Sequence, residues 1–398
     1  KLNSLLDITS KLKIKCQLKL KILRLYINSH FQYELRLYGL GATWIERKMD
    51  TLCARHVREW LTMPVSGCVK ELMVLPENRA GLNVPSFRNT AEKLHLQKRF
   101  KLKTNSQLDM NFLWAETTEK NVNTDALLGN SQDLTSALSK LKKSQTDITT
   151  SHILGLKSQG LAIKCVLENI LERDIVSWTK TLDKLPNFIH NFARKAMQQM
   201  LPTAANLTRW GKIADPTCRL CNNGSAQTNK HVLSNCSAQV ALKRYTKRHN
   251  DVLQLLADWL LSNRSKDYSL HVDIESNKFK RVADVFDNRV RPDIILVDFH
   301  RIIVLELTIC HETNLCNSRS FKQNKYKNLN SYLRSDMDSR ALNIFTLEVS
   351  TLGFMSDLTD FIKAAGLPKI PESLRSEITG KTVSNSFAVY RARDNNTD

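Results

Sequence analysis

Residues 291–326 read RPDIILVDFHRIIVLELTICHETNLCNSRSFKQNKY, and this stretch decides the fold of the C-terminal part of the chain. Two runs of β-branched and aliphatic residues, 294–297 and 302–305, are too short for buried helices and predict two strands. A tight turn at Phe299 and His300 would join these strands as a hairpin. The polar segment after the second strand predicts a helix.

The register of this hairpin decides which acidic residues face each other. With a two-residue turn, Asp298 pairs with Arg301, and the same register carries Asp293 opposite Glu306, with Cβ atoms roughly 5 Å apart. Both carboxylates then lie on one face of the sheet, where they repel each other unless a cation lies between them. Oxygen ligands of this kind predict a Mg²⁺ or Mn²⁺ site.

Hydrolysis of a phosphodiester also requires a group that activates water and neutralises developing charge, and a lysine beside the metal serves both purposes. In the usual Pro-Asp, Asp/Glu-x-Lys arrangement this lysine stands at position 308, which is Thr308 here. Lys322 and Lys325 are three residues apart and share a helix face, so either could reach the site instead. A Pro-Asp dipeptide by itself also fits an ordinary strand start. Together with the register and the lysines, it predicts a metal-dependent nuclease.

Charge is the unusual feature of the composition, since 59 Lys and Arg against 39 Asp and Glu give a formal net charge of +20. Such an excess attracts polyanions and predicts nucleic acid as the partner. An anionic membrane is the weaker candidate, because no apolar run approaches the length of a spanning helix and no signal-peptide pattern opens the chain. We therefore expect a soluble, intracellular protein and, because residue 1 is Lys1, a fragment of a longer one.

Three of the nine cysteines cluster with a histidine in the pattern Cys218-x2-Cys221-x9-His231-x4-Cys236. These residues supply a complete tetrahedral shell for Zn²⁺ and leave no open position, which predicts a structural CCHC zinc knuckle. The spacing leaves open whether the knuckle binds nucleic acid or supports the next domain. Basic side chains that follow it favour contact with nucleic acid: Lys243, Arg244, Lys247, Arg248 and His249.

The patterns along the chain predict a multidomain protein with a mainly α-helical N-terminal half, a small zinc knuckle and an α/β domain with a mixed sheet. We expect a helical region over 1–116, a polar linker with helices over 117–205, the knuckle over 206–240 and the α/β domain over 241–398. A short helix is expected over 133–143, a longer one over 161–182 and a closing helix over 371–378.

The order of the motifs resembles the C-terminal half of non-LTR retrotransposon proteins that carry a restriction-like endonuclease. The resemblance rests on TRWGKIADPTCRLC (208–221), the knuckle, KRHNDVLQLL (247–256), RPDI, ELT and FKQNKY (321–326). In those proteins a reverse transcriptase is followed by a thumb, a zinc knuckle and the nuclease. The resemblance thus implies a thumb-like region over 1–116 and a restriction-endonuclease-like domain of PD-(D/E)xK type over 241–398. Residues 59–87 look like the region after the polymerase palm, with Ala80 and Asn83 where glycines are usual.

By this resemblance, Asp293 and Glu306 are the metal ligands, Lys322 or Lys325 is the catalytic lysine, and Tyr326 is the tyrosine that accompanies it. Cys310 and His311 stand where relatives often have an apolar Pro-aromatic pair. Glu312 matches a commonly acidic position, either as a partner of the ligands or as a charge at a helix start.

The family scheme implies a nuclear enzyme that nicks one strand of double-stranded target DNA, so that the exposed 3′ hydroxyl primes copying of the element RNA. No two aspartates are adjacent in the sequence, so we expect no polymerase active site in this chain. The alternative function is a catalytically inactive nucleic-acid-binding scaffold that retains the knuckle and the basic helices. A third interpretation, a polymerase thumb that binds template and primer, is weakened by the missing aspartate pair.

Overall fold

A computed structural model of the chain describes residues 1–37, 40–117, 126–129, 133–287, 289–334 and 340–394. The chain divides into two compact units, Lys1–Gly160 and Leu161–Asp398. The described residues are mostly helical, with one small mixed sheet and one Cys/His cluster. The boundary between the units falls inside residues 117–205, the range that the sequence assigns to a linker with helices.

The first unit is built from helices that bury their apolar sides, such as Val57 and Trp60 of α6. Its helices are α1 (Leu2–Lys11), α2 (Cys16–Ile22), α3 (Asn28–His30), α4 (Gln32–Leu37), α5 (Ala42–Ile45), α6 (Thr51–Trp60), α7 (Val69–Val74), α8 (Phe87–Thr104), α9 (Leu108–Thr117) and α11 (Leu134–Leu154). The first unit also contains three short helical segments, η1 (Leu23–Ile27), η2 (Glu46–Asp50) and η3 (Glu77–Arg79).

Helix α11 extends well beyond the short helix that the sequence predicts over 133–143. Asp133 begins it, since its carboxylate accepts the backbone N–H groups of Thr135 and Ser136 at 2.9 and 3.1 Å. Ala137 packs with Leu96 of α8 in a small core cluster. This tertiary packing stabilises a polar, Thr-rich segment that has little helical preference of its own.

The turn after α7 explains why glycines are usual at two positions of the 59–87 motif. Ala80 and Asn83 have φ angles of +58° and +52°, in the left-handed region that only glycine adopts without strain. Gly81 lies between them, and a Cβ atom there would come within 1.9 Å of the Leu75 carbonyl oxygen. The backbone of this turn therefore requires Gly81.

The second unit contains both sets of candidate functional residues. Its helices are α12 (Leu161–Asn169), α13 (Glu172–Lys184), α14 (Asn187–Met197), α15 (Ala204–Arg209), α16 (Gln239–Asn263), α17 (Leu315–Lys325), α18 (Thr359–Ala364) and α19 (Glu372–Arg391). Short turns of helix are η5 (His231–Asn235), η6 (Val282–Asp284), η7 (Glu312–Asn314) and η8 (Leu329–Tyr332).

The sheet has the order β1-β2-β3-β4, from Ser269–Val272, Ile294–Val297, Arg301–Cys310 and Ala341–Ser350. The first three strands pair antiparallel, whereas β4 runs parallel to β3 after a crossover that contains α17. The β2–β3 register pairs Ile294 with Leu305, and Asp298 N–H donates to the Arg301 carbonyl at 3.0 Å. The predicted mixed sheet and hairpin register are both confirmed.

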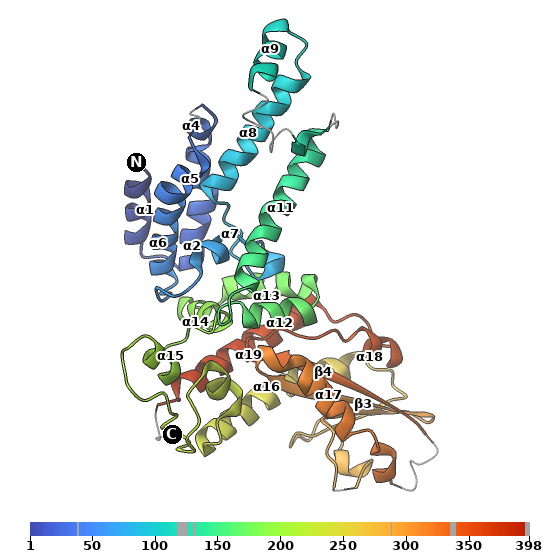
Figure 1. Ribbon diagram of the computed structural model, residues 1–398. Coiled ribbons are helices and arrows are strands. Elements are labelled where there is room, and N and C mark those ends of the chain that lie inside the picture. Colours follow the sequence, from blue (N-terminus) through green and yellow to red (C-terminus); the bar gives the residue numbers. More distant parts are fainter. Residues whose placement is uncertain (38–39, 118–125, 130–132, 288, 335–339, 395–398) are drawn as a thin grey trace. The chain divides into compact units, whose positions relative to one another are not determined.

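Each face of the sheet has its own cover (Figure 1). Leu296, Leu305 and Leu307 pack in one core with residues of α16, α18 and the start of α19. Ile295 and Val304 point the other way, where Tyr326, η6 and η8 cover them. Because side chains alternate along a strand, Glu306 shares the second face with Val304.

Three other elements differ from the sequence expectation. The helical pattern over 161–182 is divided into α12 and α13, and the closing helix expected over 371–378 continues as α19 to Arg391. Strand β1 was not predicted, because the alternation of polar and apolar residues over Ser269–Val272 covers only four positions.

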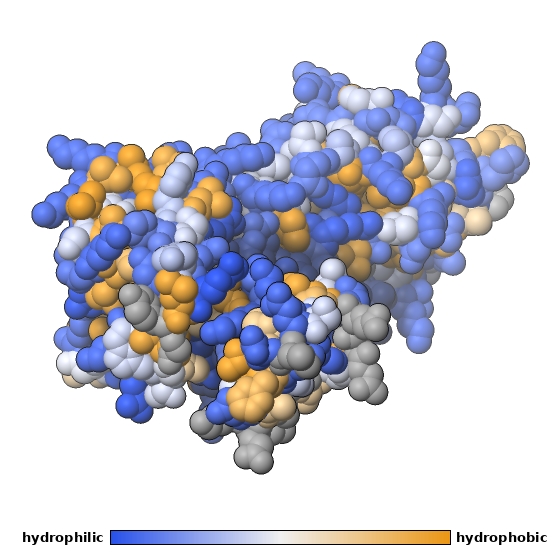
Figure 2. Space-filling model, turned by 90° about the horizontal axis from the view of Figure 1, so that it is seen from above, coloured by the Kyte–Doolittle hydropathy of each residue, from blue (hydrophilic) through white to orange (hydrophobic). Residues whose placement is uncertain are grey.

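Hydrophilic residues cover most of the face drawn in Figure 2, with hydrophobic residues in small groups between them. None of the helices in the described ranges is long and apolar enough to cross a membrane.

Candidate functional site

Asp293 and Glu306 face each other at the end of the hairpin. The backbone N–H of Asp293 donates to Oε2 of Glu306 at 3.2 Å, and the N–H of Leu307 donates to Oδ2 of Asp293 at 2.8 Å. Asp293 is 8% exposed and Glu306 only 2% exposed. Burial raises the pKa of Glu306, and the negative charge of Asp293 raises it further, although the ammonium of Lys322 partly offsets both effects.

Helix α17 brings the two candidate lysines to this pair in different ways. Lys322 Nζ contacts Oε1 of Glu306, and the Tyr326 hydroxyl donates to the same oxygen at 3.1 Å. Lys325 Nζ instead donates to the Tyr326 hydroxyl at 2.9 Å. Tyr326 is fully buried, and its pKa is raised by burial and then by the charge of Glu306, so it stays a neutral donor. The structure thus brings Lys322, and not Lys325, into contact with a carboxylate.

His249 from α16 also contacts Asp293, with Nε2 3.4 Å from Oδ1. Burial lowers the pKa of His249, but the hydrogen bond to Asp293 and its negative charge outweigh that effect and raise the pKa above the usual value. The sequence predicts His249 as a nucleic-acid contact, and its link to Asp293 was missed. No signal in the sequence indicates that contact, because 44 residues separate the two and only the tertiary fold joins them.

A polar stripe continues from Glu306 along the same face of the sheet. Thr308, which occupies the usual lysine position, pairs in register with Glu348 of β4. Glu348 is fully buried, and Arg319 Nη2 lies 2.9 Å from its Oε2. Arg319 and Lys322, three residues apart on α17, thus neutralise one buried carboxylate on each of the two parallel strands.

His311 and Glu312, which follow β3, connect the ends of two strands. Glu312 is buried, and its Oε1 accepts the Thr351 hydroxyl and the Leu352 N–H, both at 2.9 Å. His311 Nε2 lies 3.5 Å from the other carboxylate oxygen. These contacts tie the end of β3 to the end of β4, so Glu312 is more than a charge at a helix start.

The second candidate site is the Cys/His cluster. The ligand atoms of Cys218, Cys221, His231 and Cys236 all lie within 4.8 Å of one another. The Cys218 and Cys236 sulfurs are 4.0 Å apart, and Cys221 Sγ is 3.4 Å from His231 Nε2. Two sulfurs about 2.3 Å from a shared tetrahedral Zn²⁺ would be roughly 3.8 Å apart, so these residues fit the ion.

The local fold positions these ligands before and after a turn. Asn222 and Gly224 have φ angles of +50° and +78°, which allow the chain to reverse after Cys221. The N–H of Cys218 then donates to the Ser225 carbonyl at 2.9 Å. Tyr245 of α16 fixes the other two ligands, since its hydroxyl accepts the Cys236 N–H at 3.2 Å and donates to the Val232 carbonyl at 2.7 Å.

The protonation state of His231 favours the same metal. Burial lowers the pKa of His231, which keeps the imidazole in its neutral, metal-binding form. Burial raises the pKa of Cys236 to about 12, so a bound Zn²⁺ ion would have to displace the proton of this thiol.

Residues 168–242 match a family described as zinc-binding in reverse transcriptase. The matched range contains all four ligands of the cluster and extends upstream through α13, α14 and α15. It therefore begins earlier than the knuckle that the sequence predicts over 206–240. A search of curated proteins finds no match. The chain thus contains a reverse transcriptase-type zinc-binding region with a Cys/His metal site.

The basic residues after the knuckle do not all point outward. Arg248 is 1% exposed, and its guanidinium donates to the Leu233 carbonyl at 2.9 Å and to the Ser386 hydroxyl at 2.8 Å. The prediction that Arg248 contacts nucleic acid is therefore corrected, because its buried side chain instead joins α16 to η5 and α19. Lys247 is exposed and pairs with Asp251 at 3.0 Å. Contact of Lys243 and Arg244 with nucleic acid remains a prediction.

Proposed function

We propose that this chain is the nucleic-acid-binding and DNA-nicking part of a retroelement protein. The observation that carries the proposal is the group formed by Asp293, Glu306 and Lys322, two facing carboxylates with an ammonium against one of them. Its place in a mixed sheet, the net charge of +20 and the match to a zinc-binding region of reverse transcriptases support it.

Asp293 and Glu306 would hold a Mg²⁺ or Mn²⁺ ion, since hard oxygen ligands suit these metals and the two carboxylates otherwise repel each other. When bound, such an ion lowers the pKa of a water ligand and polarises the phosphate. Lys322 lies beside the ligand oxygens, where its charge can stabilise negative charge on a phosphate. Tyr326 holds Glu306 through its hydroxyl, and His249 holds Asp293 through its imidazole.

The nicked substrate would be double-stranded target DNA in the nucleus, and the exposed 3′ hydroxyl would prime copying of the element RNA. This part of the proposal rests on the resemblance to non-LTR retrotransposon proteins. The zinc-binding region supports a retroelement-related, nucleic-acid-binding role, because knuckles of this kind commonly bind single strands.

The second candidate function is a nucleic-acid-binding scaffold without catalysis. Thr308 favours it, because the usual lysine position of a Pro-Asp, Asp/Glu-x-Lys site carries no charge here. One measurement distinguishes the two functions. It is the conversion of supercoiled plasmid to open circles in the presence of Mg²⁺ or Mn²⁺. The nuclease performs the conversion, and the scaffold binds the plasmid without cutting it.

A further inference from the structure

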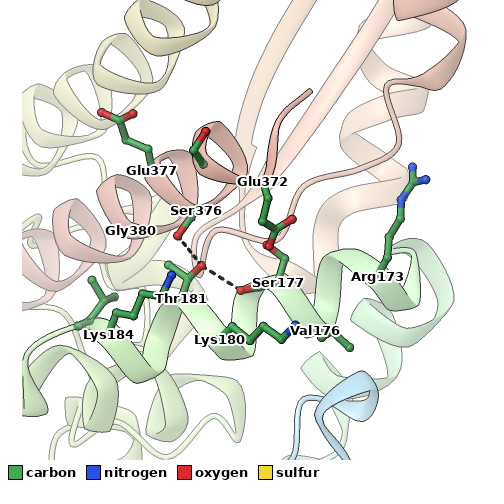
Figure 3. Close-up of a pocket in the computed structure, with 12 residues that line it drawn as sticks. Arg173, Val176, Ser177, Lys180, Thr181, Lys184, Glu372, Ser376, Glu377 and Gly380 are labelled. Atoms are coloured by element: carbon green, nitrogen blue, oxygen red, sulfur yellow. Dashed lines mark hydrogen bonds between the residues drawn. The ribbon is translucent and has the colours of Figure 1, made fainter. Parts of the chain in front are cut away.

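A groove of about 770 Å³ lies between α13 and α19, away from both the carboxylates and the zinc ligands. The two helices pack against each other below it, partly through an ion pair between Asp174 and Arg375. Figure 3 shows the groove with α13 as one wall and α19 as the other.

The α13 wall is basic. Arg173, Lys180 and Lys184 line it at spacings of seven and four residues, which places them on one side of the helix. All three side chains are exposed. Arg173 pairs with the exposed Asp357, but the structure records no acidic partner for either lysine among the described residues. In Figure 3 the Lys184 side chain extends toward Thr181 and Ser376.

Hydroxyl groups form the floor of the groove. The hydroxyls of Thr181 and Ser376 are 2.9 Å apart and hydrogen-bond across the two helices. The Ser177 hydroxyl also lines the groove, is buried and has no hydrogen-bond partner among the described residues. An unpaired donor in a groove that Lys180 and Lys184 also line suits a phosphate oxygen as acceptor.

An exposed aromatic ring lies beyond the end of α13. Phe188 at the start of α14 is 57% exposed, and its ring centroid is 5.1 Å from that of Phe387. Phe387 follows Gly380, which lines the groove, by seven residues and so lies on the same side of α19. An exposed ring in line with a basic groove is the arrangement on which unpaired bases stack.

We propose that this groove binds a single strand of nucleic acid, with phosphates along α13 and a base stacked on Phe188. Axes of packed helices lie about 8–10 Å apart, a spacing that suits one strand better than a duplex. Glu372 and Glu377 on α19 also line the groove, and in Figure 3 the Glu372 carboxylate faces α13, where it can accept from base amino groups. The inference rests on the proposed nucleic-acid-binding role but not on cleavage.

The test measures binding of the full chain to fluorescent single-stranded oligonucleotides by anisotropy, without Mg²⁺ so that no cleavage occurs. Lys180→Ala/Lys184→Ala and, separately, Phe188→Leu should each weaken binding about 5-fold or more. The matched control, Lys266→Ala/Lys369→Ala, removes the same charge from exposed positions outside the groove and should change affinity less than 2-fold.

The salt dependence provides a second readout. The slope of log K against log salt should fall by about 1.4 in the groove double variant, since each lost phosphate contact on a single strand removes about 0.7. Equal losses in the groove and control variants, or no effect of Phe188→Leu, would overturn the proposal and leave a nonspecific basic surface. Plasmid nicking by these variants reports separately on the carboxylate site, so either idea can fail alone.

Discussion

The ammonium of Lys322 lies against Oε1 of Glu306, on the face of the sheet where Asp293 also presents its carboxylate. The lysine comes from α17 and not from the strand that carries the glutamate. In the proposed nuclease, a helix would therefore supply the charge that a strand residue supplies in the usual arrangement. This contact makes Lys322 our candidate for the working lysine.

We expect Lys322→Ala to lower plasmid nicking by at least about 100-fold, because it removes the only lysine charge that touches a carboxylate in this part of the described structure. Lys325→Ala is the matched variant on the same helix and should retain most of the activity, since its partner is the Tyr326 hydroxyl. Equal loss in both variants, measured as single-turnover rates with DNA binding checked by anisotropy, would refute this assignment.

Zinc should be an integral part of the fold of the second unit. Apparent binding energies of structural zinc sites reach about 10–16 kcal/mol, so Cys218→Ser should lose the metal and the hydrogen-exchange protection of residues 217–236. His231→Cys retains four ligands that suit Zn²⁺ and should keep both. Stoichiometric zinc with undiminished protection in Cys218→Ser would argue against the four-ligand site.

Asp50 should make the first unit less stable as pH rises. Burial raises its pKa from 3.8 to about 6, so the folded state holds this proton more tightly than the unfolded state. Stability is then highest below pH 4 and decreases until pH 6, by up to about 3 kcal/mol. Asp50→Asn should flatten the dependence of the unfolding free energy on pH in urea titrations between pH 4 and 6. An unchanged slope would show that this carboxyl does not titrate as its burial requires.

The turn after α7 gives a direct test of the first unit. Gly81→Ala places a Cβ within 1.9 Å of the Leu75 carbonyl oxygen and should destabilise the unit by about 1–3 kcal/mol. Gly155→Ala is the control, because its φ angle is −70° and its nearest contact would be an ordinary 3.4 Å. Thermal unfolding of the two variants should differ clearly, and matching melting temperatures would contradict the turn geometry.

The sequence predicts the features that depend on local chemistry. A two-residue turn defines the register that places Asp293 opposite Glu306, and four ligands at short spacings define the zinc site. It does not predict that Arg248 is buried or that His249 contacts Asp293. Both residues belong to a basic run on α16, and only the packing of that helix against α19 and the sheet decides which of its sides is covered.

Helix lengths were missed for a related reason. The sequence predicts α19 only as far as residue 378, but its buried Thr379, Thr382 and Ser386 are polar and produce no hydrophobic period. Their hydroxyls hydrogen-bond to the carbonyls of Gly353, Ile378 and Thr351. Burial of such residues depends on these partners, which lie mostly in distant parts of the chain.

The plasmid assay on purified wild-type protein and on Asp293→Asn and Glu306→Gln tests whether Asp293 and Glu306 form a metal-dependent cutting site. These variants preserve side-chain size and remove one negative charge each. We predict that the wild type converts supercoiled plasmid to open circles only with Mg²⁺ or Mn²⁺. Both variants should bind the plasmid without nicking it. Nicking by either variant at the wild-type rate, or no metal-dependent nicking by the wild type, would show that these two carboxylates do not form a cutting site.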